Sequence, residues 1–285
     1  MDRFRDQALQ AILGQKKLNL ILDLDNTLLH AKIVRNLTIE DKRRIKKDDS
    51  CELHEVELQG VKLLVKLRPG VREFLKKASD MFELSIYTMG TRDYARTMAD
   101  LLALGSNQDG RSMFKKKIIS REDCTMARQK GLDVVLSDRR VVLIVDDKED
   151  VWEESCRVNV IKIAPYRFFE DGKRKREVDY NEIIAMDDDD ELKRVLSTLS
   201  MIHQMFYEDN NVDGEYMKRD VRRVLERVRD DEEQKKKDEE ELVRRKRLEE
   251  AKARRFIERF CAPVTKRCKR DATMMASVVQ SSCLV

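Results

Sequence analysis

Two aspartates separated by one residue are the first feature of the sequence that could do chemistry. Asp23 and Asp25 lie in the segment LDLDNTLL, at the end of a compact run of Leu and Ile. Side chains of a strand alternate with a period of two, so both carboxylates would lie on the same side of it. Two like charges so close repel unless a cation lies between them or one is protonated. A strand that enters an ordinary Asp/Asn turn has the same pattern, so the motif alone leaves both interpretations open.

Two further apolar runs also end in polar side chains. ELSIYT ends at Thr88, and VVLIVDD ends in Asp146 and Asp147. Lys130 precedes the second of these runs, where its ammonium could offset the carboxylates. Taken singly, Thr88 is typical of a turn and Lys130 of a solvated surface. Four acids converging on one crevice predict a hard-cation site with oxygen ligands, for which Mg²⁺ is the expected occupant.

The elements that must position these residues predict an α/β fold. Residues 18–25, 83–88, 141–147 and 159–165 are the expected core strands, and helical patterns alternate with them along the chain. Such alternation indicates a parallel sheet with helices on both faces. In sheets of this kind the functional crevice lies beyond the carboxyl ends of the strands, so the polar strand ends belong at one edge.

Segments between the core elements carry expectations of their own. ELHEVELQ and VKLLVKL alternate apolar and polar residues around Gln59 and Gly60, which predicts a β-hairpin inserted after the first strand. Residues 32–49, which precede it, are expected to be a basic and irregular stretch. Residues 129–136 are expected to begin a helix.

Composition predicts four segments along the chain. They are an N-terminal helix at 1–17, a catalytic domain at 18–210, a charged helical extension at 211–262 and a disordered tail at 263–285. The extension has no apolar residue over a long charged run, so it is expected to be a solvated helix rather than a second core.

Composition also limits the class of protein. Charged residues make up 40% of the chain but the net charge is only +4, so no overall nucleic-acid signature emerges. The six cysteines form no CxxC pair and no zinc-type spacing with the three histidines, which is typical of reduced thiols in an intracellular protein. No apolar run approaches the roughly 20 residues that span a bilayer, so no membrane association is expected. The basic stretches at 42–47 and 173–176 fit either nuclear import signals or solvated surface.

Six motifs in a fixed order carry a resemblance to a known family. LDLDNTLL, KLRPGVREFL, YTMGTRDYA, IISRED, the Lys130 region and VVLIVDD resemble the RNA polymerase II tail phosphatases of the plant type. These form the FCP1-like branch of the haloacid dehalogenase superfamily. The resemblance extends from about Leu18 to Tyr207, and YTMGTRDYA is far more specific than the DxDxT pattern of the whole superfamily. It implies a haloacid dehalogenase-like Rossmannoid sheet.

The resemblance implies a role for each motif residue. Asp23 would attack the phosphoserine phosphorus and form an aspartyl-phosphate, and Asp25 would protonate the departing serine and then deprotonate water. Mg²⁺ would be held by the Asp23 side chain, the Asp25 main-chain carbonyl and Asp147.

The remaining motif residues would serve the phosphoryl group and the substrate. Thr88 and Lys130 would hold phosphoryl oxygens, and Asp146 would orient the lysine. Thr27 and Arg92 occupy motif positions as well, and supporting roles in substrate binding are expected of them.

The implied function is that of a nuclear, Mg²⁺-dependent protein serine phosphatase acting on the phosphorylated C-terminal heptad repeats of RNA polymerase II. The hairpin between Cys51 and Leu67 is too short for a closing cap, which leaves room for a polypeptide. The loop GSNQDGRSM departs from the LDP-type segment of the family, which bears on substrate preference more than on chemistry.

Two alternative functions stay open. A small-molecule phosphatase of the same superfamily would be favoured by a bulky cap, and none of sufficient length is present. A catalytically idle scaffold would be favoured by loss of Asp23, Asp25 or Asp147, and all three are present. A protein partner for the C-terminal helix is compatible with either function, whereas acids interleave with its basic residues and argue against direct nucleic-acid binding.

Overall fold

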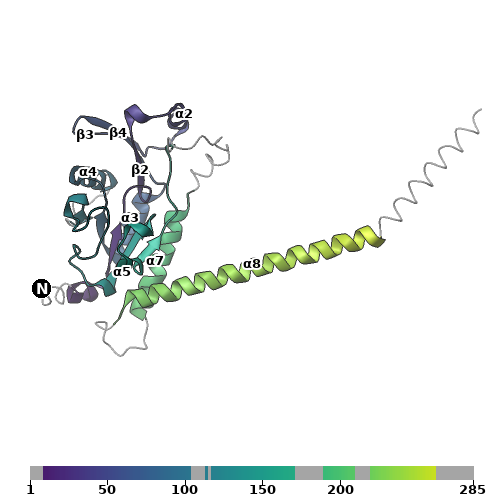
Figure 1. The fold of residues 1–285 in the computed structure, drawn as a ribbon. Coiled ribbons are helices and arrows are strands. Elements are labelled where there is room, and N and C mark those ends of the chain that lie inside the picture. The colour runs from purple at the N-terminus through teal and green to yellow at the C-terminus, as the bar shows by residue number, and fades with distance from the viewer. Residues whose placement is uncertain (1–8, 104–112, 115–116, 171–188, 209–218, 261–285) are drawn as a thin grey trace, which may run out of the picture. The chain divides into compact units, whose positions relative to one another are not determined.

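The computed structural model describes residues 9–103, 113–114, 117–170, 189–208 and 219–260 (Figure 1). Several sequence expectations therefore lie outside the described residues: the first half of the N-terminal helix, nearly all of the loop at 105–113, the basic stretch at 173–176 and the tail at 263–285. Contacts divide the chain into one compact unit at Met1–Val228 and a second at Arg229–Val285. The expected domain boundaries stay predictions.

A five-stranded parallel sheet forms the centre of the first unit, as the alternation of strands and helices predicts. The strand order is β6-β5-β1-β7-β8, with β1 in the middle. The strands are β1 (Leu18–Leu22), β5 (Phe82–Tyr87), β6 (Ile118–Ile119), β7 (Val142–Asp146) and β8 (Val160–Lys162). Every residue of β1 and β7 is buried, which is why both read as continuous apolar runs.

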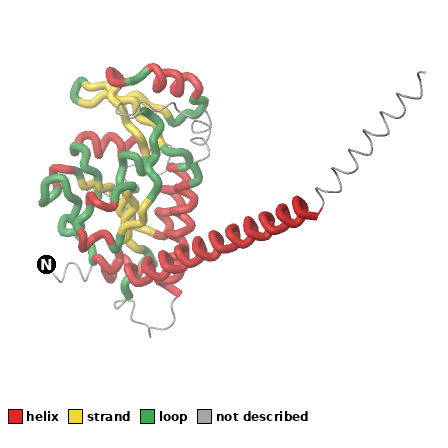
Figure 2. The backbone as a smooth tube through the Cα atoms, turned by 45° about the vertical axis from the view of Figure 1, so that its right-hand side comes forward, coloured by secondary structure: helices red, strands yellow, loops and turns green. Residues whose placement is uncertain are grey.

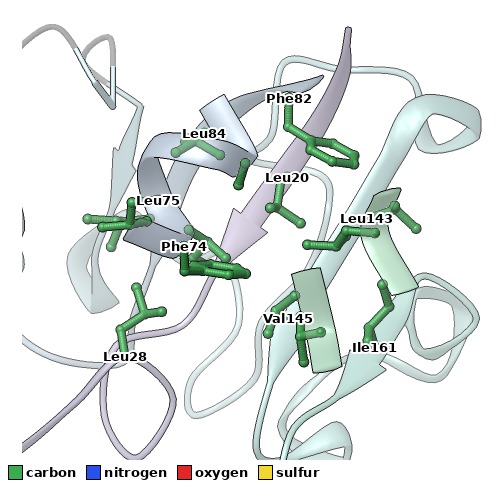
Figure 3. Packing of buried hydrophobic residues seen from close by; sticks show 14 of the residues in the cluster. Leu20, Leu28, Phe74, Leu75, Phe82, Leu84, Leu143, Val145 and Ile161 are labelled. Carbon is green, nitrogen blue, oxygen red and sulfur yellow. The ribbon is translucent and has the colours of Figure 1, made fainter. Parts of the chain in front are cut away.

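Both faces of this sheet are covered (Figure 2). Leu20 and Leu22 of β1 belong to the larger core cluster, whereas Ile21 between them belongs to a second cluster on the opposite face, as the period of two requires. Figure 3 shows side chains of the larger cluster from the strands and from helix α3. The first unit includes helices α3 (Val71–Met81), α4 (Arg92–Ala103), α5 (Glu154–Arg157) and α7 (Glu191–Glu208). Short 3₁₀ turns connect the elements: η1 (Val34–Asn36), η3 (Arg121–Asp123), η4 (Arg139–Val141) and η5 (Glu149–Val151).

The expected hairpin is present and belongs to a second, antiparallel sheet of order β2-β4-β3. Its strands are β2 (Leu29–Ile33), β3 (Leu53–Leu58) and β4 (Val61–Leu67). Gln59 and Gly60 form the connection with φ of 49° and 76°. Positive φ at both central residues is the geometry that fits a two-residue hairpin to the twist of its strands.

The expectation of an irregular stretch at 32–49 is wrong, because half of it is helix α2 (Ile39–Lys47). Thr38 begins the helix with a capping box: its hydroxyl accepts from Asp41 N at 3.0 Å, and the Asp41 carboxylate accepts from Thr38 N at 2.7 Å. Lys32 of β2 donates to the same carboxylate at 2.6 Å, and Glu170 N donates to it at 2.8 Å. Asp41 therefore ties α2 to two other segments.

Replacing Asp41 with Asn is expected to destabilise the protein at neutral pH and much less in acid. Burial raises the pKa of Asp41, but the bonds from Lys32, Thr38 and Glu170 outweigh it and hold the pKa below its usual 3.8. A depressed folded pKa gives stability that is present above the unfolded pKa and is lost as pH falls through the folded one. Urea unfolding should give a loss of about 2 kcal/mol near pH 7 that shrinks near pH 3. Asp49→Asn, at an exposed residue just beyond α2, is the control; an equal loss at both pH values contradicts the assignment.

The helix expected to begin within 129–136 is absent, and the segment consists of an isolated bridge at Lys130 followed by bends and one turn. Lys130 N donates to Val151 O at 2.8 Å and Glu153 N donates to Lys130 O at 3.0 Å, so the segment pairs with a neighbouring loop instead of coiling. A side chain at Gly131 would displace the Asp133 carboxylate, since an added Cβ would lie 2.5 Å from Asp133 Oδ1. These contacts fix Lys130 in place.

The long helix α8 (Val221–Phe260) begins within the first unit and continues into the second. Its first two turns are part of the larger core cluster, in which Val221, Val224, Leu225 and Val228 are buried. The expectation that the extension is solvated is therefore wrong for these two turns. Residues 229–255 are almost entirely exposed. Among the described residues no helix is long and apolar enough to cross a membrane.

Candidate active site

The end of β1 places the first aspartate at the carboxyl edge of the sheet. Asp23 N donates to Val145 O at 3.0 Å, which continues the pairing with β7 beyond the strand. The chain then turns at Asn26, whose φ of 62° lies in the left-handed region that Asn tolerates. Asp25 pairs with Leu29 in an isolated bridge, so the turn leads directly into β2. The DLDNT sequence is thus a strand end followed by a tight turn.

Lys130 lies between two of the predicted site carboxylates. Its Nζ donates to Asp23 Oδ1 at 2.6 Å and to Asp146 Oδ2 at 2.7 Å, and its side chain is only 2% exposed. The rings of Tyr87 and Trp152 lie 5.7 and 5.3 Å from Nζ and pack edge to face with each other. A buried ammonium with two carboxylates and two aromatic faces is held in a single position.

Burial and neighbouring charges shift the pKa values of Asp23 and Lys130 in this cluster. Burial is the main cause that raises the pKa of Asp23 to about 7; Lys130 lowers it, and Asp146 and Asp25 raise it further. Burial lowers the pKa of Lys130, but the two carboxylates more than offset this and raise it. Lys130 therefore keeps its proton, and Asp23 is the group whose charge a further cation would stabilise.

Three carboxylates of the cluster could hold such a cation. Ligand atoms of Asp23, Asp146 and Asp147 all lie within 4.8 Å of one another. Their oxygens are the donor type that hard divalent cations prefer. Burial also raises the pKa of Asp147 above its usual value, so a bound cation would stabilise the ionised carboxylate of Asp147 as well. The residues fit a divalent metal.

The hydrogen bonds separate the roles of the two neighbouring aspartates. Asp146 Oδ1 accepts from Lys148 N at 2.9 Å, and Oδ2 accepts from Lys130 and from Trp152 Nε1 at 2.9 Å. Both oxygens of Asp146 are thus engaged, whereas the Asp147 side chain accepts from no other residue in the part of the chain that the structure describes. Asp147 is positioned through its N–H, which donates to Thr27 Oγ1 at 3.2 Å. The geometry favours Asp23 and Asp147 as ligands and Asp146 as the residue that orients Lys130.

Asp25 has a partner that sequence analysis missed. Tyr94 of α4 donates its hydroxyl to Asp25 Oδ1 at 2.5 Å. Burial raises the pKa of Asp25, and this bond opposes the rise. Gly90 leaves room for the Tyr94 ring, because an added Cβ would lie 2.5 Å from Tyr94 Cδ1. Gly90 and Tyr94 of the YTMGTRDYA motif therefore act together to hold Asp25.

The other predicted site residues lie around this cluster with different degrees of exposure. Thr88 is buried after β5, donates its N–H to Ile119 O at 3.0 Å and accepts from Gly90 N at 3.0 Å. Arg92 begins α4, is 48% exposed and pairs with Asp123 at 2.6 Å. Among the described residues no bond links Arg92 to the aspartate cluster.

Arg68 is a further residue that the sequence patterns did not single out. It is buried, donates from Nε to Asp189 Oδ2 at 2.7 Å and from Nη2 to Asp189 Oδ1 at 3.1 Å, and from Nη1 to Thr27 O at 3.1 Å. The bidentate pair anchors the turn after β1 to the segment before α7. Arg68 lies within the KLRPG motif, but its partner is far away in sequence and no local pattern announces it.

A parallel sheet with two aspartates after β1 and a lysine bound between the acids of two strand ends agrees with the phosphatase domain that the sequence resemblance implies. The family described as NLI interacting factor-like phosphatase matches residues 18–212, and the chain belongs to this family.

Curated relatives and solved structures agree with this assignment. The chain is 38% identical over 241 residues to RNA polymerase II C-terminal domain phosphatase-like 4 of Arabidopsis thaliana, which covers 80% of this chain and 53% of the relative. It is 32% identical over 176 residues to an RNA polymerase II C-terminal domain phosphatase of Schizosaccharomyces pombe, covering 59% and 23%. The chain spans about half or less of the length of these relatives. The structure of fission yeast Fcp1 bound to beryllium fluoride has the same fold, with a TM-score of 0.61 at 24% identity over 78% of this chain and 73% of that one.

Proposed function

We propose that the protein is a Mg²⁺-dependent serine phosphatase that acts on the phosphorylated C-terminal repeats of RNA polymerase II through an aspartyl-phosphate at Asp23. The observation that carries the proposal is the buried ammonium of Lys130, bound at once to Asp23 and Asp146 beside Asp147. The proposed substrate is supported by the relatives, which are named as phosphatases of the RNA polymerase II C-terminal domain. A nuclear location is proposed together with this substrate.

The first half of the proposed reaction transfers the phosphoryl group to the enzyme. A carboxylate oxygen of Asp23 attacks phosphorus, the bond from phosphorus to the serine Oγ breaks, and the Asp25 carboxyl gives its proton to that oxygen. Lys130 is positioned to stabilise the phosphoryl oxygens while Asp146 keeps it oriented. The Asp23 side chain, the Asp25 main-chain carbonyl and Asp147 would hold Mg²⁺, which would supply positive charge between nucleophile and phosphate.

The second half releases phosphate. Asp25, now a carboxylate, takes a proton from water, the water oxygen bonds to phosphorus, and the bond from phosphorus to Asp23 breaks. Tyr94 holds Asp25 for both steps. Thr88 binds a phosphoryl oxygen, Thr27 positions Asp147 through its N–H, and the exposed Arg92 at the start of α4 has a supporting role in substrate binding.

Replacing Tyr94 with Phe is expected to lower kcat for phosphate release about tenfold. A hydrogen bond to a charged group contributes about 1.5–3 kcal/mol, and its loss both frees Asp25 to rotate and raises its pKa further. The rise of kcat with pH that reports the deprotonation of Asp25 should therefore move to higher pH. Tyr207→Phe, which removes a hydroxyl bonded to Lys17 O in a distant part of the fold, is the matched control. An unchanged pH profile in Tyr94→Phe would contradict the role given to this tyrosine.

The experiment that tests the proposed function is phosphate release from heptad-repeat peptides phosphorylated at the second or fifth position, across a Mg²⁺ titration. Wild type should require Mg²⁺. Asp147→Asn should need far more Mg²⁺ for half-maximal rate, whereas Asp146→Asn should lower kcat with a smaller change in the metal requirement. If wild type cleaves an aryl phosphate but neither peptide, the proposed chemistry stands and the proposed substrate is wrong. Inactivity on all phosphoesters would favour the scaffold function.

A further inference from the structure

The outward face of α2 is basic and carries one apolar side chain. Ile39, Lys42, Arg43 and Lys46 recur at helical spacing, all are exposed, and Arg35 in the preceding turn is exposed as well. Ile39 is 74% exposed. An exposed apolar side chain surrounded by cations is typical of a surface that binds an acidic partner.

The inward face of α2 holds the helix rigidly. Asp41 binds Lys32 and Glu170 N, as described above, and the buried Arg44 donates from Nη1 to Phe168 O at 3.0 Å. These bonds join α2 to β2 and to the chain after β8. The outward cations therefore form a fixed array, although each lysine and arginine side chain can move on its own.

Among the described residues, most of the array has no neutralising partner. Arg43 pairs with Glu40 at 3.1 Å, but Arg35, Lys42 and Lys46 contact no carboxylate in the described ranges of the chain. Cations of this kind often interact only with solvent. Three of them on one short helical segment, however, give a positive potential that extends about 8–10 Å into physiological salt.

Strand β2 leads from the active-site turn to the segment that contains α2, and its length is comparable to one repeat of the proposed substrate. β2 begins at Leu29, which bridges to Asp25, and leads to α2 (Figure 1). Its five residues cover about 17 Å at the usual rise of a strand. An extended, proline-rich heptad spans about 22 Å. An extended polypeptide that runs along β2 from a serine at Asp23 would carry the phosphate of a neighbouring repeat toward α2.

We propose that the outward face of α2, defined by Arg35, Lys42, Arg43 and Lys46, binds a second phosphoserine of the same polypeptide, about one repeat away from the serine that reacts. The proposal rests on the proposed function. A phosphoserine carries a charge of about −1.5 to −2, which complements the cations. Single-stranded nucleic acid is a poorer match, because it is bound on exposed aromatic side chains, and α2 carries none.

The test compares two peptides of equal length. Both carry one cleavable phosphoserine; the second also carries a nonhydrolysable phosphonate one repeat away. Wild type should have about fivefold higher kcat/KM for the second peptide, and the advantage should fall as salt rises. The triple variant Arg35→Ala, Lys42→Ala, Lys46→Ala should lose this advantage while keeping its activity on the first peptide and on an aryl phosphate.

The matched control is Lys235→Ala, Lys236→Ala, Lys246→Ala, which removes the same charge from exposed positions of α8 and should keep the advantage. Equal kcat/KM for the two peptides in wild type, or an advantage that survives in the triple variant, overturns the proposal and leaves the proposed function intact. A triple variant that loses affinity for an RNA oligomer but keeps the peptide advantage overturns it in favour of nucleic acid. If wild type cleaves the aryl phosphate and neither peptide, the proposed function fails and the inference fails with it.

Discussion

Asp23→Asn is expected to lower kcat for phosphate release by about four orders of magnitude or more, on peptide and aryl phosphates alike. The amide keeps the shape of the side chain and its Oδ1 can still accept from Lys130, but it is no longer a nucleophile. The thermal unfolding midpoint should therefore change little while turnover disappears. Asp100→Asn, at an exposed residue of α4, is the matched control and should leave turnover unchanged.

The loss should not depend on the leaving group. A variant defective only in protonating the serine would recover on an aryl phosphate, whose leaving group needs no proton, whereas a variant without its nucleophile cannot. Asp25→Asn is expected to show that partial recovery in the first half of the reaction. If Asp23→Asn retained more than a small fraction of wild-type turnover on either substrate, another group would have to attack phosphorus.

Lys130→Met is expected to remove both activity and stability. Methionine has a similar volume but leaves Asp23 and Asp146 buried without their shared cation. Breaking a buried ion pair by removing one partner costs about 3–5 kcal/mol, and loss of a preorganised charge at the phosphoryl group lowers kcat by about 10³-fold. Urea unfolding of the metal-free protein and the rate of phosphate release measure the two effects. Lys76→Met, at an exposed position of α3, is the control.

The stability deficit of Lys130→Met should depend on pH with a definite sign. Burial already raises the pKa of Asp23 to about 7 with Lys130 present, and without Lys130 it rises further. A carboxyl whose folded pKa is raised binds its proton more tightly in the folded state, so protonation favours folding as pH falls. The deficit should therefore be larger at about pH 8 than at about pH 5. A deficit that grows in acid would mean that Lys130 stabilises the fold in some other way.

Much of the fold could be predicted because its elements are specified locally. The buried strands β1 and β7 are short apolar runs, and Gln59 and Gly60 announce a two-residue hairpin. The helix α3 follows Pro69 and Gly70 and buries a regular apolar stripe. In each case the local preference of the residues agrees with the environment that the fold gives them.

The errors arose where tertiary contacts override composition. Most of α2 is charged, so it resembles a solvated loop, and its signal was the T-x-x-D capping box at Thr38 and Asp41. The segment around Lys130 and Gly131 has the residues of a helix start but is fixed by bonds to Val151 and Glu153. No window of sequence contains both partners of those bonds.

The candidate site was predictable to the extent that its residues end neighbouring strands. Asp23 and Asp146 meet because the parallel strands β1 and β7 bring their carboxyl ends to one edge, whereas Lys130 reaches both carboxylates from a loop. Tyr94 and Trp152 were missed because a tyrosine and a tryptophan in amphipathic segments are ordinary core residues until their hydroxyl and N–H are seen on Asp25 and Asp146.

The most direct test of the account is to trap the phosphorylated enzyme. Asp25→Asn is mixed with an aryl phosphate and Mg²⁺, quenched in acid and reduced with borohydride, which converts an acyl phosphate of aspartate into homoserine. Asp25→Asn should accumulate the intermediate, because attack on an aryl phosphate needs no acid but hydrolysis needs the base. The account predicts homoserine at position 23 by mass spectrometry and none in the double variant Asp23→Asn, Asp25→Asn. Homoserine at any other aspartate, or released aryl product with no modified aspartate in Asp25→Asn, would contradict nucleophilic attack by Asp23.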